Sequence, residues 1–235
     1  MSRNIKLSFS LFLNIVVVSI MCAILLASLS LLNGELFKSG YVAYVTNEKG
    51  KTVEKYTHYL KDGDDKKSAE FEKEGLRVTK VSVTSKTGKV VDYIVYTALS
   101  LFILTVFVYD KTYTVGNKDQ NAVRCGHYAE DKLRGLKVGI LAVSPDIIFF
   151  IVYVVLRFVR PSTSVGYFKI FNVIYLKILN SAMGQHSLAN VPIWGFIVML
   201  AVICFVPIVA HISYTLGYKD IKISDKLTYK KGEIK

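Results

Sequence analysis

Three polar side chains stand inside long apolar stretches of this sequence, where they could hold or move a proton. Asp146 lies in "GILAVSPDIIFFIVY", Asn14 in "SLFLNIVVV" and His211 in "IVAHISY". A charged residue costs about 2.5–3.5 kcal/mol at the centre of a membrane helix, so such residues are usually paired or functional. Asp146 and His211 could share a proton, because the pKa of histidine lies close to neutrality.

These three residues share one depth if the basic residues beside each apolar stretch mark one membrane surface. Along a helix, Asn14, Asp146 and His211 each lie ~12–13 Å from the nearest flanking lysine. We therefore predict a proton- or ion-binding layer made of these residues. The structural alternative is a layer of interhelical hydrogen bonds that fixes the register of the helices.

Other residues indicate packing or lipid contact. Small residues spaced by four let membrane helices approach closely. Two such sets occur: Ser19, Ala23 and Ala27, and then Gly135 and Gly139. At the far end of the third apolar stretch, Arg157 and Arg160 could contact anionic lipid headgroups or an acidic partner.

Motifs of the common enzyme classes are absent from the sequence. It has no HExxH, no GxSxG and no GxxxxGK[ST], and its three cysteines form no CxxC pair. We therefore predict no catalytic residues, no metal and no cofactor. The sequence favours a protein that is not an enzyme, although an intramembrane enzyme of an unfamiliar type stays open.

Four apolar blocks position these residues. Crossing a bilayer core takes about 20 helical residues. Four blocks reach that length: Leu7–Leu32, Val90–Tyr109, Val138–Phe158 and Pro192–Tyr214. We predict an all-α membrane bundle of four transmembrane helices. The first helix is expected to be an uncleaved signal anchor, with a cleaved signal peptide as the alternative.

The segments between the blocks complete the predicted layout. In order it comprises a signal-anchor helix (1–32), a small α+β extracytoplasmic domain (33–89), the second span (90–109), a cytoplasmic loop (110–137), the third span (138–158), an outer loop with an interfacial amphipathic helix (159–191), the fourth span (192–215) and a basic cytoplasmic tail (216–235).

Local patterns support parts of this layout. In the first loop, "YVAYV" and "VEKYTHYL" flank the turn "TNEKGK" and predict a hairpin, which a helix ending at Gly75 and the strand "RVTKVSVT" follow. In the middle loop, Glu130 and Arg134 at i,i+4 spacing indicate a solvent-exposed helix that also carries His127. "GYFKIFNVIYLKILN" has polar residues at helical spacing and predicts the interfacial helix.

The distribution of basic residues predicts how the chain is oriented in the membrane and which partners it has. The net charge is +12, and basic residues flank the N-terminus, the middle loop and the tail, so both termini are predicted to be cytoplasmic in the cell membrane. We expect membrane lipids and other membrane chains, or further copies of this chain, as partners, and no nucleic acid. The predicted function is a non-catalytic subunit or accessory protein of a larger bacterial membrane complex. The alternative is a small oligomeric proton or ion channel or transporter that uses the Asn14–Asp146–His211 layer.

Overall fold

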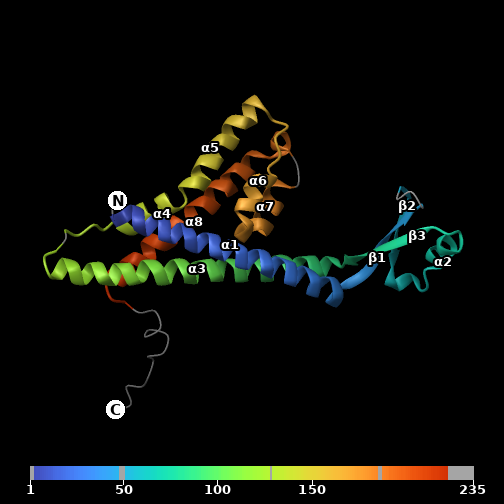
Figure 1. Ribbon diagram of the computed structural model, residues 1–235, viewed down its shortest axis with the longest axis horizontal. Helices are drawn as coiled ribbons and strands as arrows, with labels where there is room; N and C mark the ends of the chain where they lie inside the picture. The colour runs from blue at the N-terminus through green and yellow to red at the C-terminus, as the bar shows by residue number, and fades with distance from the viewer. Residues whose placement is uncertain (1–2, 48–50, 128, 185–186, 222–235) are drawn as a thin grey trace, which may run out of the picture. The chain divides into compact units, whose positions relative to one another are not determined.

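The computed structural model describes residues 3–47, 51–127, 129–184 and 187–221. The chain forms two compact units (Figure 1), of which one comprises Met1–Ala23 with Thr97–Lys235 and the other Ile24–Tyr96. We call them the helical unit and the sheet unit. Most of the predicted basic tail, from residue 222 onward, lies outside the described residues.

Three described helices are long and apolar enough to cross a membrane: α1 (Arg3–Leu36), α3 (Lys86–Arg124) and α8 (Ile193–Tyr218). The predicted third span is instead a pair, α4 (Arg134–Ala142) and α5 (Ser144–Val159), bent by 58°. The prediction of a mostly helical fold with a small sheet is confirmed. A count of four spans holds only if the bent pair is one span.

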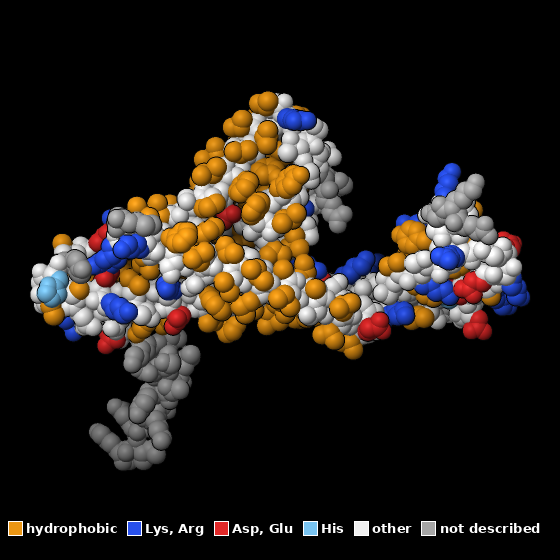
Figure 2. Space-filling model, viewed as in Figure 1, with side chains coloured by type: hydrophobic (Ala, Val, Ile, Leu, Met, Phe, Trp, Pro, Cys, Tyr) orange, Lys and Arg blue, Asp and Glu red, His pale blue; other side chains and the backbone are white. Residues whose placement is uncertain are grey.

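Apolar side chains lie on the outside of these helices. Figure 2 shows hydrophobic side chains over the region of α5, whereas charged side chains gather where α3 ends. Phe102 of α3, Ile148 of α5 and Ile197 of α8 are each more than 60% exposed. A surface of this kind suits contact with lipid.

Helix α3 is longer than predicted. It has 39 residues, a length of ~58 Å, and continues through residues 110–124, which were expected to be loop. Its last turns are helical because Thr112, Gly116 and Asp119, spaced by four and three, form a buried stripe. The loop before α4 is therefore reduced to a linker at 125–133.

The break between α4 and α5 explains why an acidic residue is tolerated at position 146. Pro145 lies at the start of α5, a position where helices accept proline. Because proline has no amide hydrogen, the carbonyl oxygen of Leu141 lacks its helical donor, and the Ser144 hydroxyl donates to it at 2.9 Å. Asp146 therefore lies in the first turn of a new helix, where the helix dipole favours an acidic residue.

The segment between α5 and α8 differs from the single amphipathic helix expected there. It forms α6 (Gly166–Phe171), a 3-10 turn η2 (Val173–Tyr175), α7 (Leu176–Met183) and a 3-10 turn η3 (Leu188–Asn190). Lys169 and Asn172, expected on a polar outer face, are both buried. The reason is that the segment packs into the core instead of lying on its surface.

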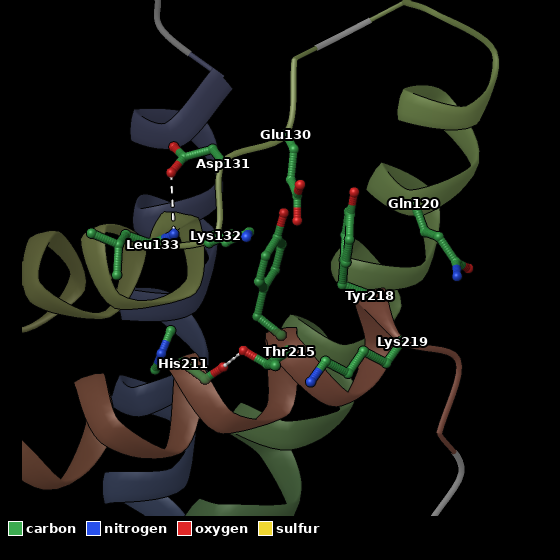
Figure 3. Close-up of a pocket in the computed structure, with 10 residues that line it drawn as sticks. Gln120, Glu130, Asp131, Lys132, Leu133, His211, Thr215, Tyr218 and Lys219 are labelled. Atoms are coloured by element: carbon green, nitrogen blue, oxygen red, sulfur yellow. Dashed lines mark hydrogen bonds between the residues drawn. The ribbon is translucent and has the colours of Figure 1, made fainter.

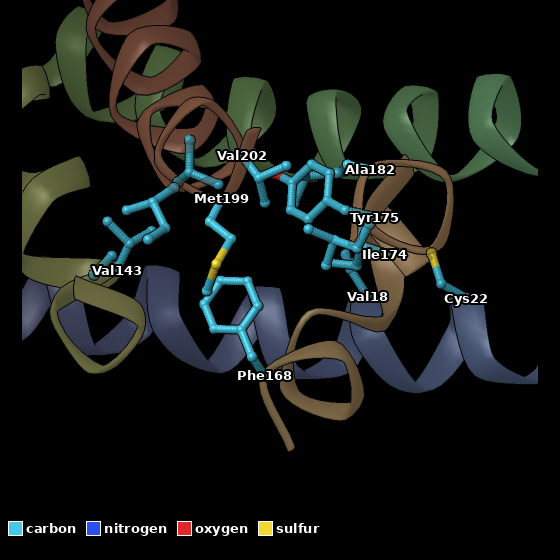
Figure 4. Packing of buried hydrophobic residues seen from close by; sticks show 14 of the residues in the cluster. Val18, Cys22, Val143, Phe168, Ile174, Tyr175, Ala182, Met199 and Val202 are labelled. Atoms are coloured by element: carbon cyan, nitrogen blue, oxygen red, sulfur yellow. The ribbon is translucent and has the colours of Figure 1, made fainter. Parts of the chain in front are cut away.

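Apolar side chains of this segment fill the core of the helical unit. Figure 4 shows Phe168 of α6 and Met199 of α8 pointing toward one another, and both side chains are fully buried. Tyr175 lies in the same cluster as Val18 of α1 and Val202 of α8. The segment thus connects α1 with α8.

Helix α8 packs against α3 with two glycines at the contact. A Cβ atom on Gly116 would lie 2.3 Å from the carbonyl oxygen of Tyr214, and one on Gly217 would lie 2.1 Å from that of Tyr113. Real Cβ atoms do not approach backbone oxygens so closely. The two helix backbones can therefore touch only because these positions carry no side chain.

The sheet unit contains three antiparallel strands in the order β2-β1-β3: β1 (Lys38–Thr46), β2 (Thr52–Tyr59) and β3 (Arg77–Thr84). A 3-10 turn η1 (Leu60–Asp62) and helix α2 (Lys66–Lys73) connect β2 to β3. Gly75 has a φ of 78°, a conformation that favours glycine just after a helix. The predicted hairpin, helix and third strand are thus present.

A carboxylate attaches α2 to the sheet. Asp65 caps α2 through the backbone N–H of Ser68 at 3.1 Å and accepts hydrogen bonds from the hydroxyls of Tyr41 and Tyr56. Burial together with these bonds raises the pKa of Tyr41 and raises that of Tyr56 to about 12. Burial opposes ionisation of Asp65, but the three donors outweigh it and lower the pKa of Asp65.

We expect Gly217→Ala to destabilise the helical unit by about 1–3 kcal/mol, because the added methyl group would overlap the carbonyl oxygen of Tyr113. Thermal unfolding of the protein in detergent, followed by circular dichroism, measures the change. Gly34→Ala is the matched control, since its Cβ would meet only the Ser82 Oγ atom at 3.6 Å. Equal melting temperatures for the two variants would contradict the packing described.

The Asp65 bonds predict two pH limits for the stability of the sheet unit. The lowered pKa of Asp65 gives a contribution that is complete above about pH 5 and is lost as the pH falls through the folded-state pKa. The raised pKa of Tyr56 gives a contribution that is complete below about pH 9 and is lost as the pH rises through about 12. Limited proteolysis of the sheet unit across this range measures both limits. An unchanged acid limit in Asp65→Asn would refute the assignment.

Candidate functional site

Asp146 borders an apolar groove of about 500 Å³ in the helical unit. Residues of α1, α5 and α6 line it, including Phe12 and Ile15 of α1 and Phe149 of α5. Its polar lining residues are Asp146, Lys169 and Ser19. The Asp146 carboxylate therefore lies among apolar side chains, but it can still be reached from outside the protein.

Few donors reach the Asp146 carboxylate. Its Oδ1 atom accepts a hydrogen bond from the Asn172 side chain at 3.2 Å. Lys169 donates instead to the carbonyl oxygen of Gly184, and no ion pair joins it to Asp146 among the described residues. Asp146 also lines an enclosed cavity of about 20 Å³ together with Tyr175, a volume that fits one water molecule.

The predicted Asn14–Asp146–His211 layer is not assembled in the structure. Asp146 accepts a hydrogen bond from Asn172, which directly follows α6 and was not among the three residues predicted for the layer. His211 lines a different cavity, which has no lining residue in common with the two at Asp146. Asn14 is half-buried and lines none of these three cavities. The depth estimate assumed a straight third helix, and the bend before α5 removes that assumption.

The cavity at His211 is larger and more polar. It has a volume of about 650 Å³ and lies between the linker at 125–133 and the last turns of α8. Figure 3 shows Glu130 directed from the linker into this space and His211 directed from α8 toward Leu133. The His211 Nδ1 atom is buried without a hydrogen-bond partner among the described residues. Because Glu130 and Lys132 both line the cavity, charge alone selects no class of ligand.

A buried charge cluster beside this cavity was not predicted. Asp119 of α3 accepts from Arg3 of α1 at 2.8 Å, from Arg134 of α4, and from the Tyr214 hydroxyl of α8 at 2.9 Å. Arg134 also donates from Nε to the side chain of Asn4 at 2.9 Å. We call these five residues the Asp119 cluster, and it ties together one end of each of four helices.

The cluster places charges against the preference of the helix dipoles. Asp119 lies near the C-terminal end of α3 and Arg134 is the first residue of α4, whereas dipoles favour the opposite signs at these ends. Arg134 is only 4% exposed and Asp119 only 7%. These two buried charges are tolerated because the charge of each residue compensates that of the other.

The interpretation of Arg134 as part of a solvent-exposed helix with Glu130 is therefore wrong. Helix α3 ends at Arg124, and Gly126 has a φ of 72°, so Cys125, Gly126 and His127 are not helical. Arg134 turns inward because Asp119 offers a buried counter-charge. The buried Thr112, Gly116 and Asp119 stripe was the sequence signal that could have revealed it.

The two predicted sets of packing residues differ in how closely other helices contact them. The two glycines of α4 lie against α8. A Cβ atom on Gly135 would lie 2.6 Å from the Cβ atom of Tyr214, and one on Gly139 would lie 2.6 Å from the Cα atom of Pro207. The set on α1 is less covered. Ser19 and Ala23 line the groove at Asp146, and Ala23 and Ala27 are exposed, the latter in the sheet unit.

The two arginines at the end of α5 also differ. Arg157 lies over the Phe196 ring of α8, with 6.0 Å between its Cζ atom and the ring centroid. Its Nη1 atom is buried without a hydrogen-bond partner among the described residues. Arg160 is exposed at the C-terminal cap of α5. Arg157 therefore contributes to packing, and Arg160 is the one open to lipid or an acidic partner.

Asp119→Asn is expected to destabilise the helical unit by about 3–5 kcal/mol, because it leaves the buried Arg134 without a counter-charge. Arg3→Gln is the control, with an expected loss below about 1 kcal/mol, since the Arg3 side chain is 44% exposed. Thermal unfolding in detergent measures both. Similar losses for the two variants would show that the cluster is not a buried ion pair.

Comparison with known proteins gives no relative from which a function could be transferred. The chain matches no protein-family model, no curated protein and no solved structure. The residues and geometry of this chain are therefore the basis on which its function is inferred.

Proposed function

We propose that this chain is a multi-span protein of the cell membrane that serves as a non-catalytic subunit of a larger complex. The observation that carries the proposal is the open face of the three-stranded sheet. Small sheets need an apolar face packed against something to be stable. Within the described residues of the sheet unit, one face is covered and the other is not.

The register of the strands defines the two faces. Ala43 and Val45 of β1 are buried on the face that carries Tyr56, which contacts Phe71 of α2 with 6.2 Å between ring centroids. Side chains alternate along a strand, so Val42 and the other even-numbered residues of β1 point to the opposite face. No described helix of the sheet unit covers that opposite face.

Apolar groups are exposed on this open face. Val53 and Tyr59 of β2 are 60% and 51% exposed, and Val81 of β3 is 51% exposed. Lys55, opposite Tyr44, places its ammonium group 5.0 Å from the centre of that ring. An exposed apolar sheet face rimmed by a basic residue suits contact with another protein chain.

Charge supports the proposed orientation. The Asp119 cluster gathers the first residue of α4, the start of α1 and the ends of α3 and α8. Basic residues are abundant in the segments beside these ends, and such segments usually remain in the cytoplasm. We therefore place both termini in the cytoplasm and the sheet unit outside it.

The channel alternative lacks a supporting observation of this kind. It required a shared site of Asn14, Asp146 and His211, and the described residues do not form one. The groove and the open sheet face both favour contact with other chains.

Purification of the tagged chain from its own membranes in mild detergent, followed by native mass measurement, tests the proposal. We expect a defined complex with at least one other polypeptide. Val81→Glu should reduce the amount of that polypeptide at least about tenfold, because it places a charge within the apolar contact.

Lys73→Glu is the matched control, since Lys73 is exposed on α2, which covers the other face of the sheet. It should leave the complex intact, and both variants should melt like the unmodified protein. A chain that is recovered alone, or a complex equally weakened by both variants, would contradict the proposal.

A further inference from the structure

We propose that the groove at Asp146 binds a membrane helix of a different chain, and that this helix carries a lysine or arginine within its apolar stretch. The inference rests on the proposed function, since it needs a complex with another chain. It adds the site of contact in the helical unit and the chemistry of the partner.

The carboxylate has unused capacity to accept hydrogen bonds. Ionised carboxylates offer about four acceptor positions. In the described part of the chain, Asp146 accepts one side-chain hydrogen bond, from Asn172, and forms no ion pair. The helix dipole favours a carboxylate in the first turn of α5, whereas the apolar lining of the groove opposes its charge unless a counter-charge is supplied. An ionised group in apolar surroundings needs further compensation, which a basic side chain provides best.

Lys169 does not supply this compensation. Although it borders the same groove, its ammonium group donates to the carbonyl oxygen of Gly184. The Asp146 carboxylate is therefore available to a group that enters from outside.

The position of the groove along α1 favours a helix over a phospholipid headgroup. Ser19 lines the groove and is ~20 Å along the helix from Lys6 and ~24 Å from Glu35, the nearest charged residues of α1. Headgroups lie at the surfaces of a bilayer whose apolar core is ~30 Å thick. A side chain on a membrane helix can be fixed at any depth, including that of Ser19.

Small residues at the groove also suit a helix. Ser19, Ala23 and Ala142 line it, and side chains of this size allow two helix backbones to approach closely. Aromatic and branched residues, including Phe149 and Ile15, complete an apolar wall.

A second copy of this chain does not fit the requirement. Residues 7–34, 90–109, 138–156 and 193–218 contain no lysine or arginine. The apolar stretches of the chain therefore offer no lysine or arginine at the depth of Asp146, and the proposed occupant is a different polypeptide.

Site-specific photo-crosslinking in native membranes tests the inference on the full chain. A benzophenone amino acid replaces Phe149 in the groove, and in a matched control it replaces Phe102, an exposed aromatic residue of α3. We expect crosslinks from position 149 to a partner peptide that lies in a membrane-spanning segment and contains lysine or arginine. Position 102 should not give this product.

Variants then test the role of the carboxylate. Asp146→Leu should lower the crosslink yield at least about tenfold, whereas Asp110→Asn, which changes an exposed acid outside the groove, should not. Because Asp146→Leu also removes the acceptor for Asn172, Ala23→Leu serves as a second variant. It fills the groove without altering the carboxylate and should lower the yield similarly.

Several results would overturn the inference. Crosslinks to lipid alone, to a second copy of this chain, or to a partner segment without a basic residue would each do so, as would yields unaffected by Asp146→Leu and Ala23→Leu. If other chains still co-purify in these cases, the proposed function stands and only the groove assignment fails. If no other chain co-purifies or crosslinks, both fail.

Discussion

The ion pair between Asp119 and Arg134 is the interaction on which the arrangement of the helical unit depends. Each partner is buried at a helix end whose dipole disfavours its charge, so neither is stable there without the other. Arg3 and Tyr214 join the same carboxylate. A single side chain of α3 thereby fixes the ends of α1, α4 and α8, and the glycine contacts along α8 then determine how closely these helices pack.

The position of α4 determines the path of the chain beyond its last residue. Because α4 is held at its first residue by Asp119 and along its length by glycine contacts with α8, the bend at Val143 directs α5 away from the path of a straight span. The space beside α1 is then partly filled by α6 and η2, and the remainder is the groove. The break before α5 thus produces both the favourable place for the Asp146 charge and the groove beside it.

The sequence predicted the elements of this fold better than their contacts. Apolar block length predicted three long helices correctly, and alternation predicted the strands around Tyr44 and Val81. The proline in "SPD" indicates a kink with a freed carbonyl oxygen, but the apolar pattern continues through it and does not predict two helices bent by 58°. The Asp119–Arg134 pair could be predicted only in part: the spacing of Thr112, Gly116 and Asp119 indicates that Asp119 faces a neighbouring helix, but it does not show that the partner is Arg134 of α4.

The candidate site shows the same limitation. Asp146 was identified as unusual because its type conflicts with its surroundings, a property that sequence displays directly. Its partner Asn172 was assigned to a polar outer surface, because helical spacing gives the face of a residue but not what covers that face. Placing His211 beside Asp146 required a straight helix, and the 58° bend removed that condition.

The hydrogen bond from Ser144 to Leu141 has a consequence for how the protein is made. Proline within an apolar stretch normally leaves a carbonyl oxygen that a neighbouring helix or water must satisfy before the stretch is stable in lipid. Here the adjacent hydroxyl satisfies it within the same turn. The bent pair therefore carries its own donor for this carbonyl oxygen, and insertion of the pair into lipid requires none from a neighbouring helix or another chain.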